Sequence, residues 1–181
     1  MKQSVNVTKA ETFAREAHKD HVRNDEAKTP YVHHLEEVAG LVEKSGGTDN
    51  EIAAAWLHDT VEDTKTTGED IKNNFGEEIA EIVYGLTDLP EFLVLPLKDR
   101  KLKQAERVKS ESTSVRRVKL ADQTSNVKIV GERHLDGFTH NDKINYIEGA
   151  WAIAQMCKGI SSFLDDEFQR RYQEAKNNLG I

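Results

Sequence analysis

Apolar residues recur every three or four positions along most of the chain, which is the spacing of one face of an α-helix. In the first third of the sequence this spacing predicts three helices, the second of which ends at Gly46-Gly47. Two capping boxes are predicted, Thr8 with Glu11 and Thr48 with Glu51. The third helix is expected to run without a break over residues 51–64.

The same spacing continues to the end of the chain. It predicts a short helix at 70–75, helices over 79–86 and from about Lys98, a long helix through 115–129, and helices over 144–154 and about 162–179. The proline-containing stretch "LPEFLVLPLKDRK" is expected to begin as an irregular loop, and "GERHLDGFTHND" to be a polar loop. The sequence therefore predicts an all-α protein, with one domain over 1–181, a motif-bearing core at about 8–155 and a C-terminal helix.

Composition narrows the class of protein. The chain has 181 residues, of which 37% are hydrophobic and 31% charged, and its net charge is −7. An acidic chain of this kind is a poor general binder of nucleic acid or of anionic membranes, which favour a basic face. No apolar run reaches the length of a signal peptide or a membrane span, and Cys157 is the single cysteine. We expect a cytoplasmic protein without an intrachain disulfide, in which Cys157 is buried.

The stretch "AAAWLHDTVEDT" places polar groups directly after a buried apolar run. His58 and Asp59 diverge by about 100° around a helix, so one ion lying between them could take a ligand from each. Glu62 and Asp63 come one turn later, where a general base for an attacking water is needed. The structural alternative is an ordinary solvated helix end.

Two further residues fit the same interpretation. Asp122 lies within the apolar stripe of the long helix, and a buried aspartate is rare unless it is paired or binds a metal. His34 shares a helix face with Val38 and Leu41, where a lone histidine is more often a core residue. Together with His58 and Asp59 these side chains form a two-nitrogen, two-oxygen set that suits a divalent first-row metal.

The motifs "TPYVHH", "AAWLHDTVEDT" and "VKLADQTSNV" resemble those of the HD phosphohydrolase superfamily. More narrowly, they resemble the hydrolase domain of the RelA/SpoT family in its stand-alone, metazoan-SpoT-like form. The likeness runs from about Thr8 to beyond Tyr146. It implies an HD-type helical bundle with one ion, typically manganese, in its core. The implied ligands are His34, His58, Asp59 and Asp122, and Glu62 with Asp63 would activate the water. The implied reaction removes the 3′-diphosphate of guanosine tetra- or pentaphosphate, giving GDP or GTP and pyrophosphate.

The resemblance also implies three substrate contacts. Arg23 would stack on the base, Asn126 would face the site from the helix of Asp122, and Tyr146 would close the pocket. A solvated loop arginine, a helix-end cap and a buried structural tyrosine are the respective alternatives. The sequence departs from the family pattern at three positions on this side, Asn24, Gln123 and Asp142, which bear on the choice of nucleotide.

Other polar groups carry weaker patterns. His134 and His140 are expected on a surface loop, and His18 and His21 in structural or solvated positions. The run "KSESTSVRRVK" is expected to be a solvated helix start, and the alternative is that its cationic side chains border a phosphate pocket, namely Arg116, Arg117 and Lys119.

The sequence leaves two rival functions. One is an HD phosphohydrolase that acts on another nucleotide, such as a nucleoside monophosphate, a dNTP or NADPH. The other is a metal-stabilised binding module without turnover, against which the presence of Glu62 and Asp63 argues. The expected partner is a small nucleotide substrate rather than a nucleic acid or a membrane. The sequence does not distinguish a monomer from a homodimer.

Overall fold

The computed structural model describes residues 4–181, whose regular structure consists of eleven helices and no strand. The helices are α1 (Val5–Ala17), α2 (Val32–Lys44), α3 (Asp49–Leu57), α4 (Thr60–Asp63), α5 (Gly68–Phe75), α6 (Glu77–Leu86), α7 (Pro90–Leu93), α8 (Leu97–Val108), α9 (Thr113–Glu132), α10 (His140–Cys157) and α11 (Ser162–Leu179). The predicted all-helical class is confirmed.

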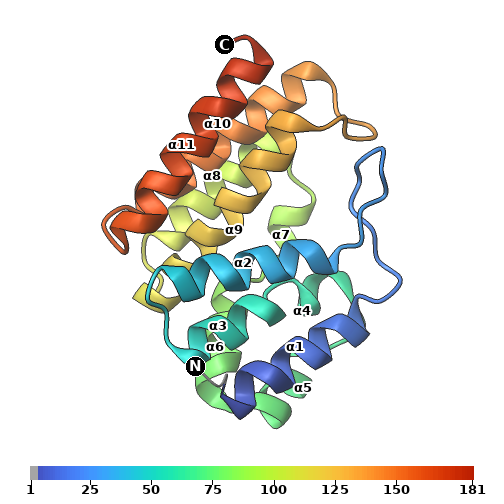
Figure 1. Ribbon diagram of the computed structural model, residues 1–181, viewed down its shortest axis with the longest axis vertical. Helices are drawn as coiled ribbons and strands as arrows, with labels where there is room; N and C mark the ends of the chain where they lie inside the picture. Colours follow the sequence, from blue (N-terminus) through green and yellow to red (C-terminus); the bar gives the residue numbers. More distant parts are fainter. Residues whose placement is uncertain (1–3) are drawn as a thin grey trace.

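The helices form two groups that meet at α2 and α9 (Figure 1). On one side α1, α3, α5 and α6 pack together, and on the other α8, α10 and α11 lie alongside α9. α9 contacts helices of both groups and is buried on most of its surface, including the polar residues from Asp122 to Ser125. Polar side chains in so buried a helix need partners, which are described below.

The first helix begins earlier than the capping pattern predicts. Ser4 is extended and its side chain accepts a hydrogen bond from the Val7 amide, so α1 starts at Val5. The predicted Thr8–Glu11 capping box is wrong: the Thr8 amide bonds to the Ser4 carbonyl inside the helix. No proline or glycine interrupts residues 4–8, and the earlier serine therefore takes the cap.

The expected continuous helix over 51–64 is also wrong, because it breaks at His58 and Asp59. The capping box of Thr48 and Glu51 opens α3 as predicted. At its far end, the His58 imidazole Nδ1 lies 2.8 Å from the Ala55 carbonyl oxygen. In an unbroken helix that carbonyl would accept from the amide of residue 59, so the imidazole competes for the acceptor and the helix ends.

The proline-rich segment contains more helix than expected. Pro90 opens the single turn of α7, and Pro96 caps α8, which starts at Leu97. A proline suits the first turn of a helix because its missing N–H would have no partner there. His140, expected on a loop, is the first residue of α10.

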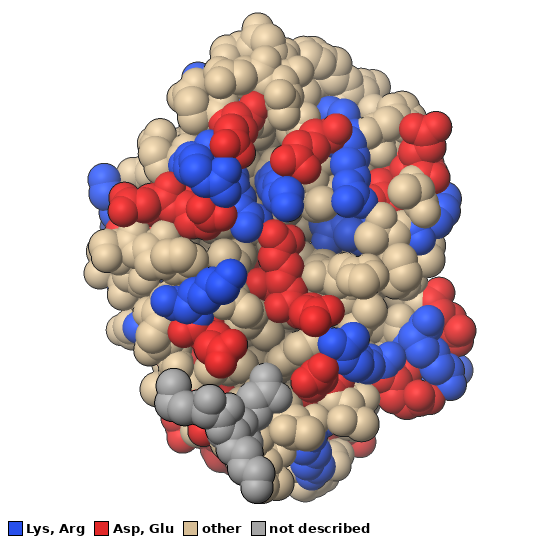
Figure 2. Space-filling view, viewed as in Figure 1, with Lys and Arg blue, Asp and Glu red and all other residues tan. Residues whose placement is uncertain are grey.

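The surface is mixed in charge. Acidic and basic side chains lie interspersed over the face seen in Figure 2, without a broad basic area on that face. Among the described residues, no helix is both long and apolar enough to cross a membrane. Cys157 is fully buried, as expected.

Candidate metal centre and active site

Four side chains from three separate parts of the chain meet in the core. His34 comes from the first turn of α2, His58 and Asp59 from the break after α3, and Asp122 from the middle of α9. His34 Nε2 lies 3.6 Å from Asp59 Oδ2 and 3.4 Å from Asp122 Oδ1. The corresponding distances from His58 Nε2 are 2.9 Å and 3.8 Å. The structure thus brings together all four residues that the sequence suggested as ligands.

Both imidazoles are oriented by a contact at Nδ1, the ring nitrogen that faces away from the cluster. His58 directs Nδ1 to the Ala55 carbonyl, and His34 directs Nδ1 to the Ser125 hydroxyl at 2.9 Å. That hydroxyl donates to Glu37 Oε2 at 2.7 Å, so it must accept from the imidazole. Each Nδ1 therefore carries a proton, and each Nε2, once deprotonated, presents a lone pair to the site, which is the arrangement of metal-binding histidines.

The buried Nε2 atoms of the two imidazoles lack hydrogen bonds. Within residues 4–181, no hydrogen bond of acceptable geometry reaches His34 Nε2 or His58 Nε2, although carboxylate oxygens lie nearby. Buried polar atoms without partners are unusual. A divalent ion that bonds nitrogen and oxygen at about 2.1 Å requires donors about 3 to 4 Å apart. The ligand atoms of His34, His58 and Asp59 all lie within 4.8 Å of one another, so the His/Asp cluster is suited to a divalent metal ion.

Electrostatics holds the carboxylates in the form that binds metal. Burial opposes ionisation of Asp59, but the His58 and His34 imidazoles outweigh it and hold its pKa well below the usual range. Asp122 is treated similarly: burial is outweighed by His34 and by the Lys119 ammonium, and its pKa is lowered. Burial disfavours protonation of His58, yet Asp59 and Asp122 raise the pKa of His58 to about 9. A cation at this site would therefore compete with a proton.

Hydrogen bonds also fix the carboxylates. The Tyr31 hydroxyl donates to Asp59 Oδ2 at 2.6 Å. Asp122 accepts from the side-chain amides of Asn126, at Oδ1, and Gln123, at Oδ2, over 2.6 Å and 2.7 Å. Lys119 Nζ lies 3.6 Å from Asp122 Oδ2. Each carboxylate thus has its orientation set by neighbours that are not themselves candidate ligands.

Glu62 and Asp63 follow Asp59 along the sequence and lie on the single turn of α4. The Asp63 amide bonds to the Asp59 carbonyl, and Glu62 Oε1 accepts from the Asp88 amide. Both residues are exposed. Crowding by protein atoms and the Asp59 charge raise the pKa of both carboxyl groups, that of Glu62 to about 7. A carboxylate with a raised pKa is a better proton acceptor, as a general base requires.

Arg23 and Asn126 are joined to each other beside the cluster. An Arg23 guanidinium nitrogen donates to Asn126 Oδ1 at 2.6 Å, and Asn126 in turn donates to Asp122. The helix-end-cap alternative for Asn126 is therefore wrong, because α9 continues to Glu132. The guanidinium carbon lies 5.7 Å from the centre of the Tyr31 ring. Arg23 is half-buried rather than a freely solvated loop residue.

Tyr146 lies on α10 and is half-buried. Its ring covers the ammonium of Lys101 at 4.0 Å from the ring centre. Lys101 in turn donates to Gln123, which donates to Asp122, so Tyr146 is linked to the His/Asp cluster through this lysine. The sequence patterns did not single out Lys101.

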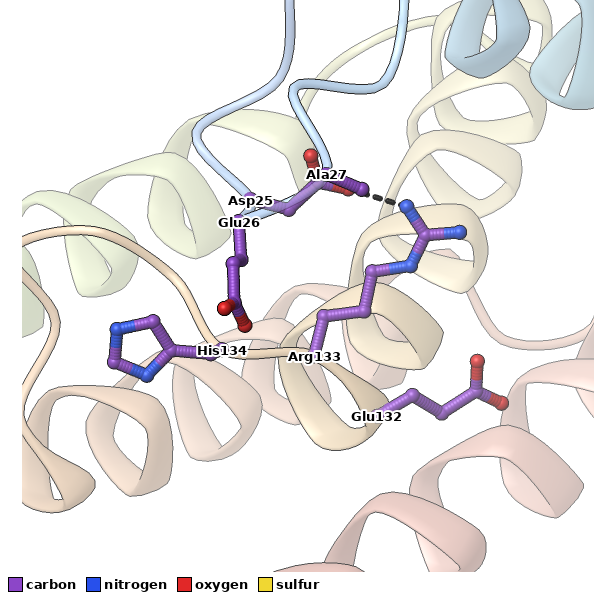
Figure 3. Close-up of a pocket in the computed structure, with 6 residues that line it drawn as sticks. All are labelled: Asp25, Glu26, Ala27, Glu132, Arg133 and His134. Atoms are coloured by element: carbon purple, nitrogen blue, oxygen red, sulfur yellow. Dashed lines mark hydrogen bonds and ion pairs between the residues drawn. The ribbon is translucent and has the colours of Figure 1, made fainter.

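The loop that carries Arg23 is fastened by residues that the sequence analysis missed. Asp25 is 1% exposed and accepts from the backbone and side chain of Thr29. Arg133, just beyond α9, extends toward this loop and pairs with Asp25 (Figure 3). The Arg23 amide bonds to the Thr29 carbonyl at 2.8 Å. An aspartate inside a polar loop has no periodic signal, so its burial could not be foreseen.

Several other polar residues have structural partners. Arg116 donates to the Met156 carbonyl. Arg117 donates to Glu51 and to the Ser45 carbonyl, so neither arginine borders the His/Asp cluster. Lys119 alone of that cationic group reaches the site. His18 is buried and stacks on Tyr31 with ring centres 5.2 Å apart.

The helical fold and the His/Asp cluster define a class of protein. A family profile described as an HD domain matches residues 10–136, and the chain belongs to this HD-domain family. Within the family, it is similar to the guanosine-3′,5′-bis(diphosphate) 3′-pyrophosphohydrolase MESH1. It is 34% identical to the Xenopus tropicalis protein over 170 residues, covering 93% of each chain. It is 31% identical to the human protein over 179 residues, covering 98% of this chain and 94% of the human one.

A solved structure shows the same fold. It is described as a metazoan ortholog of SpoT that hydrolyses ppGpp, and it superposes with a TM-score of 0.87 at 25% sequence identity. The match covers 96% of this chain and 97% of the other.

Proposed function

We propose that this protein is a manganese-dependent hydrolase that converts guanosine 3′,5′-bis(diphosphate) and its 5′-triphosphate analogue to GDP or GTP and pyrophosphate. The observation that carries the proposal is the pair of buried, unbonded imidazole nitrogens facing two ionised carboxylates. Glu62 and Asp63 follow Asp59 on the next helical turn. The relatives named for this reaction cover nearly the whole chain. We place the enzyme in the cytoplasm, acting on the alarmone of the stringent response.

In this mechanism the side chains of His34, His58, Asp59 and Asp122 would hold the ion. When bound, a divalent ion would supply Lewis-acid polarisation of a phosphate oxygen and make water more acidic. Glu62 and Asp63 accept the proton of the attacking water, whose oxygen bonds to the phosphorus next to the ribose 3′-oxygen. The bond from that phosphorus to the 3′-oxygen breaks, and a proton returns to the 3′-oxygen to give the free hydroxyl.

The remaining residues orient the substrate. Lys119, 3.6 Å from Asp122, is the cation placed to offset negative charge that develops on the diphosphate. Arg23 offers the planar face for the guanine base, and Tyr146 covers the pocket from α10.

A nucleotide panel tests the proposal. Purified protein with Mn²⁺ is incubated with ppGpp, pppGpp, nucleoside monophosphates, dNTPs and NADPH, and pyrophosphate, orthophosphate and triphosphate are measured separately. We expect pyrophosphate from the two alarmones, and no product after the metal is removed with a chelator. A His58→Ala variant is the protein control. Preferential release of orthophosphate from a monophosphate or NADPH, or of triphosphate from a dNTP, would contradict the proposed substrate.

A further inference from the structure

Lys101 is a lysine enclosed in the protein interior, close to the His/Asp cluster but not part of it. The residue is 4% exposed and lies on α8, the helix that packs along α10. Gly149 on α10 makes this position possible. A Cβ atom at residue 149 would lie 2.4 Å from the Lys101 Cβ and 2.7 Å from its Cγ. The lysine stem therefore occupies a notch that only glycine leaves open.

The end of the Lys101 side chain contacts two acceptors. Its Nζ lies 4.0 Å from the centre of the Tyr146 ring, whose face is electron-rich, and 2.9 Å from Gln123 Oε1. Gln123 is 1% exposed, and its Nε2 donates to Asp122 Oδ2 at 2.7 Å. A continuous chain of hydrogen bonds thus leads from α8 to the outer oxygen of a candidate metal ligand.

The direction of these hydrogen bonds, from donor to acceptor, depends on Lys101. A glutamine amide has an oxygen end and a nitrogen end of nearly equal shape, and only its partners decide which way it faces. The amine donates to the oxygen, so the NH₂ group must face Asp122. In the reversed orientation the amide oxygen would meet Asp122 Oδ2 and the NH₂ group would meet the Lys101 amine, so two buried hydrogen bonds would be lost.

The orientation of the Gln123 amide matters for the His/Asp cluster. With Oδ2 held by Gln123, Asp122 turns Oδ1 toward His34 Nε2 and His58 Nε2, at 3.4 Å and 3.8 Å. Polarisation along the chain further strengthens the last hydrogen bond. Partners of this kind typically change metal affinity by 10- to 100-fold when they are removed.

We propose that Lys101 is a positioning residue for the metal centre: it fixes the Gln123 amide, which in turn holds Asp122 in its metal-binding orientation. The inference rests on the proposed metal centre, but not on the identity of the nucleotide.

The test measures Mn²⁺ affinity of the metal-free protein by calorimetry, without substrate. Lys101→Met keeps the length of the stem and removes the donor. Lys103→Met is the matched control, since Lys103 lies on the same helix and pairs with Glu106 at the surface. Gln123→Met removes the side chain that links Lys101 to Asp122 by hydrogen bonds. The Lys101→Met/Gln123→Met double variant completes the double-mutant cycle. Circular dichroism reports folding of each variant.

We expect Lys101→Met to weaken Mn²⁺ binding about tenfold, with Lys103→Met unchanged and the double variant no weaker than Gln123→Met. Wild-type affinity in Lys101→Met overturns the inference, and so does a double variant in which the two losses add. If Lys101→Met does not fold, Lys101→Arg decides, because it keeps an N–H donor. It should bind Mn²⁺ within about threefold of wild type while Gln123→Met is about tenfold weaker, and the reverse order overturns the inference. Failure of the wild type to bind Mn²⁺ would refute the metal centre itself, whereas a different nucleotide preference leaves this result intact.

Discussion

Replacing Glu62 by Gln separates chemistry from binding at this site. The amide keeps the shape of the carboxyl group, and its oxygen can still accept from the Asp88 amide as Glu62 Oε1 does. The turn of α4 and the loop at Asp88 should therefore stay in place. What is lost is the ability to take a proton from water.

The size of the effect follows from that role. Loss of a general base costs 10²- to 10⁴-fold in turnover, or about 3 to 5 kcal/mol of transition-state stabilisation. Mn²⁺ affinity should be nearly unchanged, because Glu62 is not one of the four converging donors. The Michaelis constant should change little by comparison with turnover.

The assay is the initial rate of pyrophosphate release from ppGpp at saturating Mn²⁺, alongside a calorimetric metal titration. Glu91→Gln is the matched control, an exposed glutamate on α7 near the same loop. Asp63→Asn and the double variant show whether the two carboxylates share the proton. If Glu62→Gln and the double variant both turn over at the wild-type rate, the assignment of the base is refuted.

The pH profile gives an independent check. A base acts only when ionised, so kcat/KM should fall as the pH drops through its pKa. The protein atoms that crowd the carboxyl group, together with the Asp59 charge, raise the pKa of Glu62 from 4.5 to about 7. Water at this exposed carboxyl and a bound cation both favour the charged form, so the acid limb should lie between those two values. The limb should shift in Glu62→Gln and stay in the control.

Four further predictions test the surroundings of the site. Asp122→Ala should lose bound metal and activity together, and an unchanged metal content by mass spectrometry would contradict its assignment. Ser125→Ala should weaken Mn²⁺ binding by about 10- to 100-fold, while Thr124→Val, which loses a hydroxyl bonded within α9, should not. Arg23→Ala should raise KM by about tenfold to a hundredfold with little loss of turnover, and recovery by Arg23→Lys would indicate a phosphate contact instead. Asp25→Asn should lower the free energy of unfolding by about 2 to 3 kcal/mol, measured by urea titration, and a loss below 0.5 kcal/mol would show that the loop contact is weak.

The sequence predicted the fold class and the convergence of the cluster for a physical reason. Helical periodicity places His34 and Asp122 on inward faces, and a buried charge demands a partner whatever the exact packing. The same periodicity could not reveal the break at His58, because that break depends on an imidazole reaching a backbone carbonyl. Nor could it indicate Lys101, since a lysine that is 4% exposed violates the pattern by which buried positions are recognised. That residues 1–181 form one domain stays a prediction.

The departures from the family pattern have structural explanations on the substrate side. The Asn24 side chain bonds to the Asp136 carbonyl, and the Asp136 amide bonds back to the Asn24 carbonyl, so Asn24 joins the Arg23 loop to the segment after α9. Asp142 completes the capping box that opens α10. A residue that already satisfies neighbouring backbone groups is constrained by folding, and its identity is weak evidence about the nucleotide.

Gln123 differs from those two departures, because it donates a hydrogen bond to the candidate metal ligand Asp122 and accepts one from Lys101. Of the three positions it is the one through which this chain can change the chemistry rather than the scaffold. A calorimetric Mn²⁺ titration and a substrate panel, run on Gln123→Lys beside Asn24→Lys and Asp142→Lys, separate the two cases. We expect the first to alter metal affinity and turnover together, and the other two to alter KM for the nucleotide or the stability alone. Altered metal affinity in Asn24→Lys or Asp142→Lys would show instead that the loop and the start of α10 are coupled to the cluster.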